Sequence, residues 1–349
     1  MTVEEVEHDD PAPHEVIVRT VAVGLCHSDY HVIDGVLDRP RPIILGHEAA
    51  GEVIAIGSDV TSVSIGDRVA TCLVMGCGDC PRCRRGEPAH CSNQTSARRP
   101  AGAAPRISRD GQAIGQMTGV GALCEEMIIS DRAVTRLPDS IPLHLAPLLG
   151  CAVVTGLGAV LTVAQAQPED SVAVIGCGGV GIAVIQGARI AGVRRIIAVD
   201  MSAAKLAMAR TFGATDVVDA SQGDPVAQVR ELTGGEGVDH AFEVVGREST
   251  VQQAFEMAAF GRRAYALGIH ADDAPVTIPT VGLRRGKSLV GVFMGDTQPR
   301  LDIPRYAGYW ADGKLDLESM VSHTLALEQA NEGFALMAGG EAARVVITF

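Results

Sequence analysis

The chain has 349 residues and a formal net charge of −13, and 47% of its residues are hydrophobic, 20% charged and only 3% aromatic. This is the composition of a globular protein about two average domains long. The acidic balance argues against a general role on nucleic acid or on an anionic membrane, because either partner would be repelled. The 40 glycines and the few aromatic residues indicate many tight turns and an aliphatic core, which is typical of a parallel sheet.

The first part of the chain predicts a β-rich domain. Short runs of β-branched residues, separated by Gly, Pro and Asp, occur up to about Arg136. Strands this short and closely spaced are typical of a barrel-like or sandwich-like domain. The predicted strands are Val16–Val23, Ile43–Leu45, Glu52–Ile56, Arg68–Leu73 and Glu126–Ile129.

After Cys151 the pattern changes to strands that alternate with helices. This alternation predicts a doubly wound parallel sheet, and the final strand, Arg344–Phe349, is expected to rejoin the first domain. The predicted strands are Ser171–Ile175, Arg195–Val199, Asp216–Val218, Asp239–Val245 and Arg263–Leu267. The predicted helices are Ser202–Phe212, Val226–Leu232 and Thr250–Ala259.

The two most apolar windows, Leu143–Ala164 and Val172–Val193, are long enough to span a membrane. Glycines interrupt both windows, and Gln186 and Arg189 lie in the second, so we interpret them as buried strands and helices. The start of the chain shows no basic region followed by an apolar one, and we therefore expect a cytoplasmic protein without a disulfide framework. Nine cysteines in a reducing compartment need another explanation, usually a metal or catalysis.

A glycine motif predicts a dinucleotide site. Gly176, Gly178, Gly179, Val180 and Gly181 lie between a predicted strand and a helix. The first glycine allows a tight turn, the second lets a pyrophosphate approach the backbone at the helix N-terminus, and the third lets helix and strand pack closely. A motif of this kind alone is weak, but here the strand, the helix and an acidic residue after the next strand all agree.

The acidic residue is Asp200, nineteen residues after the motif, and its carboxylate would accept hydrogen bonds from the adenosine ribose. A carboxylate repels a 2′-phosphate, and Met201 follows in place of a neutralising Arg, so the sequence favours NAD over NADP. Lys205, one turn into the next helix, could reach the same ribose or could be a solvated helix residue.

Four cysteines in one Gly- and Pro-rich loop predict a structural zinc site. Cys77, Cys80, Cys83 and Cys91 are separated by two, two and seven residues. Four thiolates suit tetrahedral zinc, which would stabilise a segment with little apolar content. An iron–sulfur cluster is the alternative, but the bacterial cluster run has three residues before its last Cys and a Pro after it. Here seven residues precede Cys91, and Ser92 follows it.

Cys26 and Cys151 form a second group with His47. Cys26 begins the stretch Cys-His-Ser-Asp, His47 stands in Gly-His-Glu, and Cys151 lies at the seam between the two regions. A catalytic zinc takes three protein ligands and an open position, and two Cys with one His is a known set. Spacing alone does not single out these residues, because each taken alone fits an ordinary buried position. The other cysteines, Cys72, Cys124 and Cys177, are interpreted as core residues.

Taken in order, these motifs resemble the zinc-dependent alcohol dehydrogenases of the medium-chain dehydrogenase/reductase superfamily, over nearly the whole chain. The resemblance rests on Cys26–Asp29, Gly46–Glu48, Gly66–Val69, the four-cysteine loop, Gly150–Cys151 and the glycine motif. It implies an α/β fold made of a Rossmann-type doubly wound parallel sheet and a GroES-like, β-barrel-like catalytic domain. The implied catalytic domain covers residues 1–152 and 294–349, and the NAD-binding domain covers residues 153–293.

The resemblance also implies roles for individual residues. Cys26, His47 and Cys151 would hold a catalytic zinc, and the four-cysteine loop a structural one, which makes two Zn²⁺ per chain. Asp29 would orient His47, and Glu48 would lie behind the metal. Ser28 would take the proton of the alcohol and His31 would pass it to solvent, although His31 also fits an ordinary surface position. The residues expected to contact NAD, besides those of the glycine motif, Asp200 and Lys205, are His27, Thr155, Leu267, Gly268, Ile269 and Arg344.

The implied reaction is oxidation of a primary alcohol to an aldehyde, or the reverse, with hydride transfer to NAD. Polyol dehydrogenases of the superfamily typically have Glu where Cys151 stands, which favours a simple alcohol. Dehydrogenation of a formaldehyde–thiol adduct is the alternative. Thr95 replaces the Arg usual in glutathione-dependent enzymes, so a glutathione adduct is disfavoured and a mycothiol adduct stays open. A zinc-containing nucleotide sensor without turnover is a further alternative, disfavoured because every catalytic group is present.

The resemblance leaves three points as expectations. We expect a homodimer or homotetramer that binds no nucleic acid and no membrane. The chain begins late relative to the family, so a short barrel strand is expected to be missing at the N-terminus. The basic stretch Ala97–Arg109 is interpreted as a solvated loop, with a position at the substrate entrance as the alternative.

Overall fold

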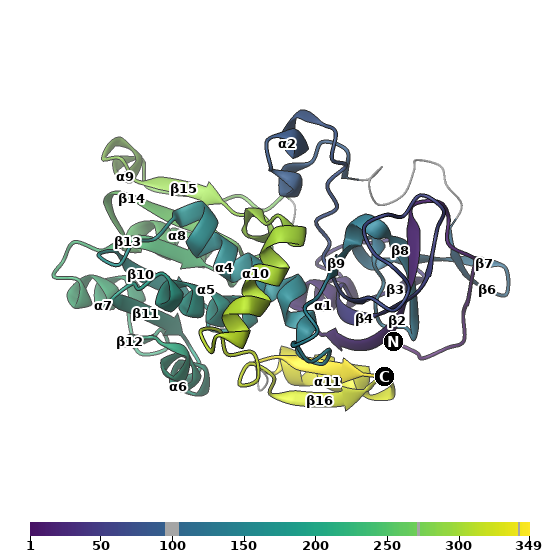
Figure 1. The fold of residues 1–349 in the computed structure, drawn as a ribbon. Coiled ribbons are helices and arrows are strands. Elements are labelled where there is room, and N and C mark those ends of the chain that lie inside the picture. Colours follow the sequence, from purple (N-terminus) through teal and green to yellow (C-terminus); the bar gives the residue numbers. More distant parts are fainter. Residues whose placement is uncertain (95–104, 271–272, 341–342) are drawn as a thin grey trace. The chain divides into compact units, whose positions relative to one another are not determined.

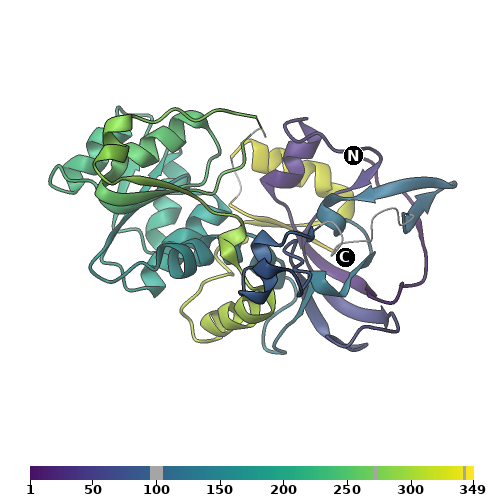
Figure 2. The same cartoon turned by 90° about the horizontal axis from the view of Figure 1, so that it is seen from above.

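The chain forms two compact units (Figures 1 and 2). Unit 1 contains Met1–Val154 and Thr297–Phe349, and unit 2 is the continuous segment Thr155–Asp296. A computed structural model describes residues 1–94, 105–270, 273–340 and 343–349. Unit 2 is therefore an insertion between two segments of unit 1.

Unit 1 is built on two sheets. The larger sheet has the order β16-β17-β2-β4-β5-β9, with β8 also paired to β2, and the smaller sheet has the order β1-β6-β7-β3. Strand β2 is central, because it pairs antiparallel with β4, β8 and the C-terminal strand β17. The strands of unit 1 are β1 Glu7–His8, β2 Glu15–Gly24, β3 Ile43–Ile44, β4 Glu48–Ile56, β5 Arg68–Thr71, β6 Ile107–Arg109, β7 Gln112–Gln116, β8 Glu126–Ser130, β9 Val134–Arg136, β16 His323–Ala326 and β17 Val345–Thr348. The helices are α1 His27–Ile33, α2 Pro81–Arg84, α10 Pro299–Ala311 and α11 Ala330–Ala338, with short 3₁₀ turns η1 Pro88–His90, η2 Met117–Gly119, η3 Asp131–Ala133, η4 Ala146–Gly150 and η7 Leu327–Gln329.

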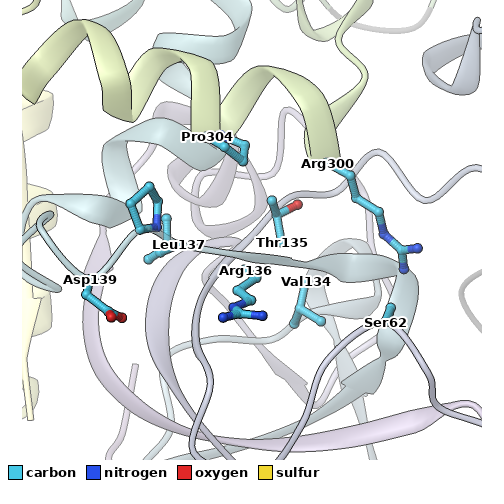
Figure 3. A pocket seen from close by; sticks show the side chains of 9 residues that line it. Ser62, Val134, Thr135, Arg136, Leu137, Asp139, Arg300 and Pro304 are labelled. Atoms are coloured by element: carbon cyan, nitrogen blue, oxygen red, sulfur yellow. The ribbon is translucent and has the colours of Figure 1, made fainter.

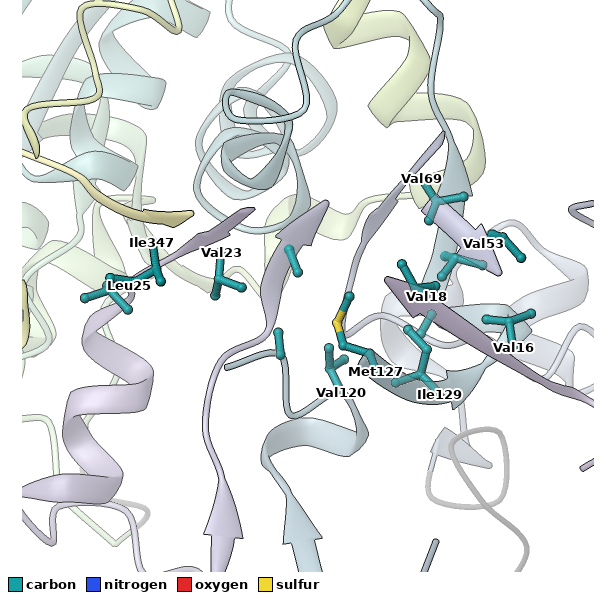
Figure 4. Packing of buried hydrophobic residues seen from close by; sticks show 14 of the residues in the cluster. Val16, Val18, Val23, Leu25, Val53, Val69, Val120, Met127, Ile129 and Ile347 are labelled. Atoms are coloured by element: carbon teal, nitrogen blue, oxygen red, sulfur yellow. The ribbon is translucent and has the colours of Figure 1, made fainter. Parts of the chain in front are cut away.

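The core of unit 1 is aliphatic and lies between these strands (Figure 4). Val16, Val18 and Val23 of β2 are fully buried and belong to one cluster with Met127 and Ile129 of β8. Ile17, which lies between Val16 and Val18 on the other face of the strand, is buried in a second cluster with Ile128, so both faces of this part of β2 are covered. The first cluster also holds residues of β17 and α11, so the C-terminal segment is part of the first domain's core.

Unit 2 is a doubly wound parallel sheet. Its strand order is β12-β11-β10-β13-β14-β15 and all five pairings are parallel. Helices connect the strands and cover the sheet (Figure 1). The strands are β10 Ser171–Ile175, β11 Arg195–Asp200, β12 Asp216–Asp219, β13 Val238–Glu243, β14 Ala258–Ala266 and β15 Ser288–Gly291. The helices are α4 Ala152–Gly158, which begins in unit 1, α5 Gly179–Ile190, α6 Ala203–Phe212, α7 Pro225–Leu232, α8 Glu248–Met257 and α9 Thr280–Arg284, with the π-helical turn η5 Ala159–Ala164 and the 3₁₀ turn η6 Met294–Asp296.

The observed elements differ from the predicted ones at several ends. The predicted helix Thr250–Ala259 ends at Met257, because Ala258 is extended and begins β14. The predicted strand Asp239–Val245 ends at Glu243, whose carboxylate accepts hydrogen bonds from the next turn. The apolar window Val172–Val193 contains β10 and α5, as interpreted. Among the described helices, none combines the length and apolar character needed to cross a membrane.

Candidate active site

Four side chains with metal-binding atoms meet inside unit 1. The ligand atoms of Cys26, His47, Glu48 and Cys151 all lie within 4.8 Å of one another. Each of the four residues is at most 7% exposed. A buried cluster of two thiols, an imidazole and a carboxylate is the donor set that zinc prefers.

Close backbone packing brings these residues together from three segments. Cys26 follows β2 and precedes α1, His47 directly precedes β4, and Cys151 follows η4. Gly150 has no room for a side chain, since an added Cβ would lie 2.1 Å from the carbonyl oxygen of Thr71 on β5. Gly46 has φ +90°, a conformation that favours glycine. Both glycines therefore serve to place the neighbouring residue of the cluster.

His47 is held in one orientation. Its Nδ1 lies 3.2 Å and 3.1 Å from the two carboxylate oxygens of Asp29, and Asp29 Oδ1 also accepts a hydrogen bond from the Gly46 amide at 2.8 Å. His47 Nε2 is buried and has no hydrogen-bond partner among the described residues. A buried imidazole nitrogen without a partner is costly unless it binds something that the protein itself does not supply.

The environment of this cluster alters the acidity of its groups. The hydrogen bond with Cys151 lowers the pKa of the Cys26 thiol well below its usual value, with a further contribution from His47, although burial alone would raise it. Burial raises the pKa of Glu48 to about 8, against the opposing effect of the Arg344 guanidinium. Arg344 donates from Nη1 to Glu48 Oε1 at 3.2 Å and to the carbonyl oxygen of Leu25 at 3.1 Å.

The four-cysteine loop forms a second cluster in unit 1. The sulfurs of Cys77, Cys80, Cys83 and Cys91 lie within 4.8 Å of one another, with 3.9 Å between Cys77 and Cys83 and between Cys80 and Cys91. Tetrahedral zinc with bonds of ~2.3 Å places its sulfurs roughly 3.8 Å apart, whereas a disulfide needs ~2.05 Å. Backbone amides point at the sulfurs, among them the amide of Asn93, which lies 3.3 Å from Cys91 Sγ.

In unit 2 the glycine motif lies between β10 and α5, and its three glycines have different constraints. Gly176 has φ +95°. An added Cβ on Gly181 would lie 1.8 Å from the Gly176 carbonyl oxygen, so this glycine permits contact between helix and strand. Gly178 has nothing within 4 Å of an added Cβ, which leaves space for a ligand beside the helix N-terminus.

Asp200 lies beside this motif at the end of β11. Its Oδ2 accepts a hydrogen bond from the Cys177 amide at 2.8 Å, and its Oδ1 accepts one from the Ser202 amide at 2.9 Å. Ser202 caps α6 by accepting a hydrogen bond from the Lys205 amide. Asp200 is therefore fixed beside the glycine loop, with Lys205 in the first turn of the adjoining helix.

Two family descriptions match the chain along most of its length. Residues 12–139 match the alcohol dehydrogenase GroES-like domain, and residues 179–307 match the zinc-binding dehydrogenase family. The chain belongs to the zinc-dependent alcohol dehydrogenase family of the medium-chain dehydrogenase/reductase superfamily. This assignment makes it an oxidoreductase, and the predicted combination of a Rossmann-type sheet with a GroES-like domain is confirmed.

Solved structures resemble this dehydrogenase over its whole length. An alcohol dehydrogenase zinc-binding domain protein from Burkholderia ambifaria has a TM-score of 0.94 and 29% identity, covering 100% of this chain and 95% of that chain. Benzyl alcohol dehydrogenase from Acinetobacter calcoaceticus has a TM-score of 0.91 and 28% identity, with coverages of 99% and 94%. Alcohol dehydrogenase TADH from Thermus sp. ATN1 has a TM-score of 0.81 and 31% identity, with coverages of 98% and 95%.

The residues expected to move the proton, Ser28 and His31, lie on α1, which directly follows Cys26 of the first cluster. Ser28 Oγ is 3.4 Å from Cys26 Sγ. His31 is one turn further along α1, with 22% of its side chain exposed and its Nδ1 3.4 Å from Asp34. The rings of His27 and His31 are 6.4 Å apart. The roles of Ser28 and His31 in proton transfer stay predictions.

Other expected cofactor residues are divided between the units. In unit 2, Thr155 is buried and donates to the sulfur of Met294 at 3.6 Å, and Leu267, Gly268 and Ile269 follow β14. Arg344 belongs to unit 1, where it is buried against Glu48. Its contact with the cofactor stays a prediction.

The basic stretch after the four-cysteine loop is only partly described. Arg98, Arg99 and the position Thr95, used to weigh thiol adducts, lie outside the described residues. Arg106 is partly buried and pairs with Asp9 and Glu15, and Arg109 pairs with Glu4. These two arginines attach the N-terminal segment to β6. The interpretation of Ala97–Arg109 as a solvated loop did not include these ion pairs.

A pocket of about 480 Å³ lies elsewhere in unit 1, between β9 and α10 (Figure 3). Its lining includes Arg136 and Arg300, which contact Asp67 and Asp131, respectively. It contains none of the metal-binding or glycine-motif residues, and its arginines are already paired. We assign it no function.

The sequence reasoning missed two apolar side chains near the glycine motif. Met201 is 69% exposed and directly follows Asp200, and Val245 is 41% exposed and follows β13. An added Cβ on Gly176 would lie 2.7 Å from Val245, so Val245 is adjacent to the motif. In the sequence, only Met201 could have indicated an apolar surface at this position, because it is a large apolar residue directly after Asp200.

Proposed function

We propose that this protein oxidises a primary alcohol to an aldehyde, and catalyses the reverse reaction, with NAD as the hydride carrier and two zinc ions per chain. The observation that carries the proposal is the buried cluster of Cys26, His47 and Cys151, in which His47 Nε2 has no partner among the described residues. Structural histidines normally satisfy both ring nitrogens when buried. Here Asp29 satisfies Nδ1 and leaves Nε2 available to bind a metal.

The residues of both clusters fit zinc. Cys26, His47 and Cys151 would hold the catalytic ion, and the four thiols of the loop would hold the structural ion. Zinc in the first site would supply a Lewis acid that lowers the pKa of an alcohol hydroxyl, and NAD would supply the hydride acceptor. Glu48 is paired with Arg344, so we place it beside the ligand set as a group that balances charge.

The chain's own groups would move the proton. Ser28 Oγ lies beside the metal ligand Cys26 and would accept the hydroxyl proton of the alcohol. Ser28 would pass its own hydroxyl proton on as it accepts this one, and His31, partly exposed one turn later on α1, would release a proton to water. Asp29 would keep the His47 ring aligned throughout, since it is fully buried and fixed by the Gly46 amide.

Asp200 supports NAD as the cofactor. Two backbone amides hold its carboxylate beside the glycine motif, where it would accept hydrogen bonds from the ribose and repel a 2′-phosphate. Met201 and Val245 would offer apolar surfaces to a purine, since both are exposed.

A primary alcohol is favoured on two grounds. Cys151 stands at the position where polyol dehydrogenases of the superfamily typically have Glu. One similar structure is a benzyl alcohol dehydrogenase, which supports an alcohol whose hydroxyl is on a primary carbon. We therefore expect short-chain or aromatic primary alcohols to be the best substrates.

A substrate screen tests this function. The purified protein would be mixed with NAD and with aliphatic, aromatic and terpene-like alcohols, and separately with formaldehyde plus glutathione or mycothiol, while NADH absorbance is followed. Turnover of primary alcohols without thiol is expected. Turnover that depends on a thiol would replace the proposal with adduct oxidation, and binding of NADH without any turnover would indicate a sensor.

The metal assignment has its own control. Cys26→Ser should lose one of two zinc ions, measured by elemental analysis, together with the activity. Cys72→Ser is the matched control, because Cys72 is equally buried but belongs to neither cluster. Full activity in Cys26→Ser would refute the catalytic zinc site.

We also infer a homodimer or homotetramer. Strand β15 is the edge of the six-stranded sheet, with no further strand paired to it among the described residues. Phe260, Val281, Leu283 and Phe293 of the same unit are each 42% to 50% exposed. An unpaired edge with exposed apolar residues favours association, and light scattering after size exclusion would measure it.

A further inference from the structure

We propose that Glu243 is a positioning residue of the nucleotide site, where its buried carboxylate fixes the turns that follow β13 and β14. The proposal rests on the proposed function, because it assumes that NAD binds at this edge of the unit 2 sheet. Glu243 is the last residue of β13 and is fully buried. Its strand pairs with β10, which leads into the glycine motif, and with β14.

One carboxylate oxygen organises the turn after β13. Glu243 Oε1 accepts hydrogen bonds from the amides of Val245 and Gly246, both at 2.8 Å, and from the hydroxyl of Thr250 at 2.7 Å. Three donors on one carboxylate oxygen form a strong local network. This network fixes residues 244–250, including the start of α8.

The backbone of Glu243 organises the second turn. Its carbonyl oxygen accepts hydrogen bonds from the amides of Leu267 at 2.9 Å and Gly268 at 3.2 Å. The two turns touch through their backbones, since an added Cβ on Gly268 would lie 2.1 Å from the amide nitrogen of Gly246. An added Cβ on Gly246 would lie 2.2 Å from the Ile269 carbonyl oxygen. A shift of one turn must therefore move the other.

The first turn also contacts the glycine motif. The Val244 amide donates to the carbonyl oxygen of Ile175, directly before the motif, at 3.0 Å. Val244 and Val245 lie 3.2 Å and 2.7 Å from an added Cβ on Gly176. The ligand-binding edge of a parallel sheet lies at the carboxyl ends of its strands. Glu243 thus connects three loops of that edge.

Glu243 acts through these loops and not by touching the cofactor. Its Oε2 is also buried, has no hydrogen-bond partner among the described residues, and lies 2.9 Å from an added Cβ on Gly268. A carboxylate kept from solvent with one oxygen unused is costly. That cost is consistent with a role in holding the site in its binding conformation.

The test compares Glu243→Ala, Glu243→Gln and Thr250→Val with wild type. Glu248→Gln is the matched control, because Glu248 is an exposed acid five residues further along the same segment. NADH affinity would be measured by fluorescence titration, and KM for NAD, KM for alcohol and kcat by steady-state kinetics. Hydrogen exchange of residues 244–250 and 266–269 would be followed without cofactor.

Glu243→Ala should weaken NADH binding roughly 10- to 100-fold, because misplaced loops lose cofactor contacts. KM for NAD should rise in parallel while KM for the alcohol stays within about twofold of wild type. Glu243→Gln, which keeps the shape and loses the charge, should have an intermediate effect. Amides 244–250 and 266–269 should exchange faster in Glu243→Ala, and the Glu248→Gln control should match wild type.

A lower melting temperature with unchanged NADH affinity in the folded fraction would overturn the proposal, because that result indicates a merely structural role. If Glu243→Ala does not fold, unchanged affinity in both Glu243→Gln and Thr250→Val would overturn it equally. Failure of wild type to bind NADH would instead refute the proposed function, and this proposal with it.

Discussion

Replacing Asp200 by Asn should change the nucleotide preference of the enzyme. The carboxylate of Asp200 is fixed by the amides of Cys177 and Ser202 at 2.8 Å and 2.9 Å. Asn keeps one acceptor oxygen but loses the charge. It would therefore bind the ribose hydroxyls of NAD less strongly and would no longer repel a 2′-phosphate.

The size of the change follows from two terms. A hydrogen bond to a charged group contributes about 1.5–3 kcal/mol, so NAD binding should weaken about 10- to 100-fold. Two charges about 4 Å apart interact with about 1 kcal/mol in water and about 4 kcal/mol near a protein surface. Because Asp200 is partly exposed, relief of this repulsion should lie between those limits. Together the terms should shift the NAD/NADP ratio of kcat/KM by at least about 50-fold.

The assay is steady-state kinetics with each nucleotide at a saturating concentration of the best alcohol. Asp219→Asn is the matched control, because Asp219 is paired in register with Asp200 on the next strand. It also accepts a hydrogen bond from an amide two residues on, that of Ser221. A nucleotide ratio that stays within about threefold of wild type in Asp200→Asn would refute the reasoning.

Three further predictions concern folding, metal content and pH. Gly178→Ala should keep the melting temperature, because its Cβ would meet no protein atom, but should lose NADH binding, because the Cβ would fill the space left for the pyrophosphate. Gly181→Ala should unfold the domain, because its Cβ would lie 1.8 Å from a carbonyl oxygen. Thermal melts and NADH titration would distinguish the two variants. Cys80→Ser should lower the zinc content from two ions to one and lower the melting temperature. Cys26→Ser should remove the activity with a smaller fall in melting temperature. Equal melting temperatures for the two variants would contradict this prediction. Burial lowers the pKa of Lys287 to about 8, below its usual 10.5. The folded chain therefore binds this proton less readily than the unfolded chain, so its contribution to the free energy of unfolding should increase as pH rises from about 8 to above 10. Urea unfolding of wild type and Lys287→Met across this range would show the difference, and parallel curves would contradict it.

Local patterns predicted the geometry of the glycine motif in most detail. The tight turn at Gly176, the open approach at Gly178 and the close packing at Gly181 each have a counterpart in the structure. This succeeds because strand, turn, helix and acidic residue are consecutive in the chain, so short-range sequence rules determine their geometry. The cysteines of the loop are equally local, and their sulfurs lie together.

Long-range contacts limited the rest of the prediction. Cys26, His47 and Cys151 come from segments more than 100 residues apart at their extremes, and only the family resemblance grouped them. The hairpin β6–β7 and the edge strand β15 were missed, because short strands are set by their partners more than by their own sequence. The role of Glu243 depends on donors and carbonyls in two different loops, which no spacing rule reveals.

The insertion of unit 2 into unit 1 has a consequence for synthesis on the ribosome. Residues 155–296 are continuous, so the nucleotide-binding unit can fold as soon as it has emerged. The sheet of unit 1, by contrast, leaves the Ala22–Gly24 end of β2 unpaired on one side until β17, near the C-terminus, is released to pair with it. The nascent chain thus exposes this short strand end and the apolar core residues beside it until translation is nearly complete, and a chaperone would bind the chain during that period.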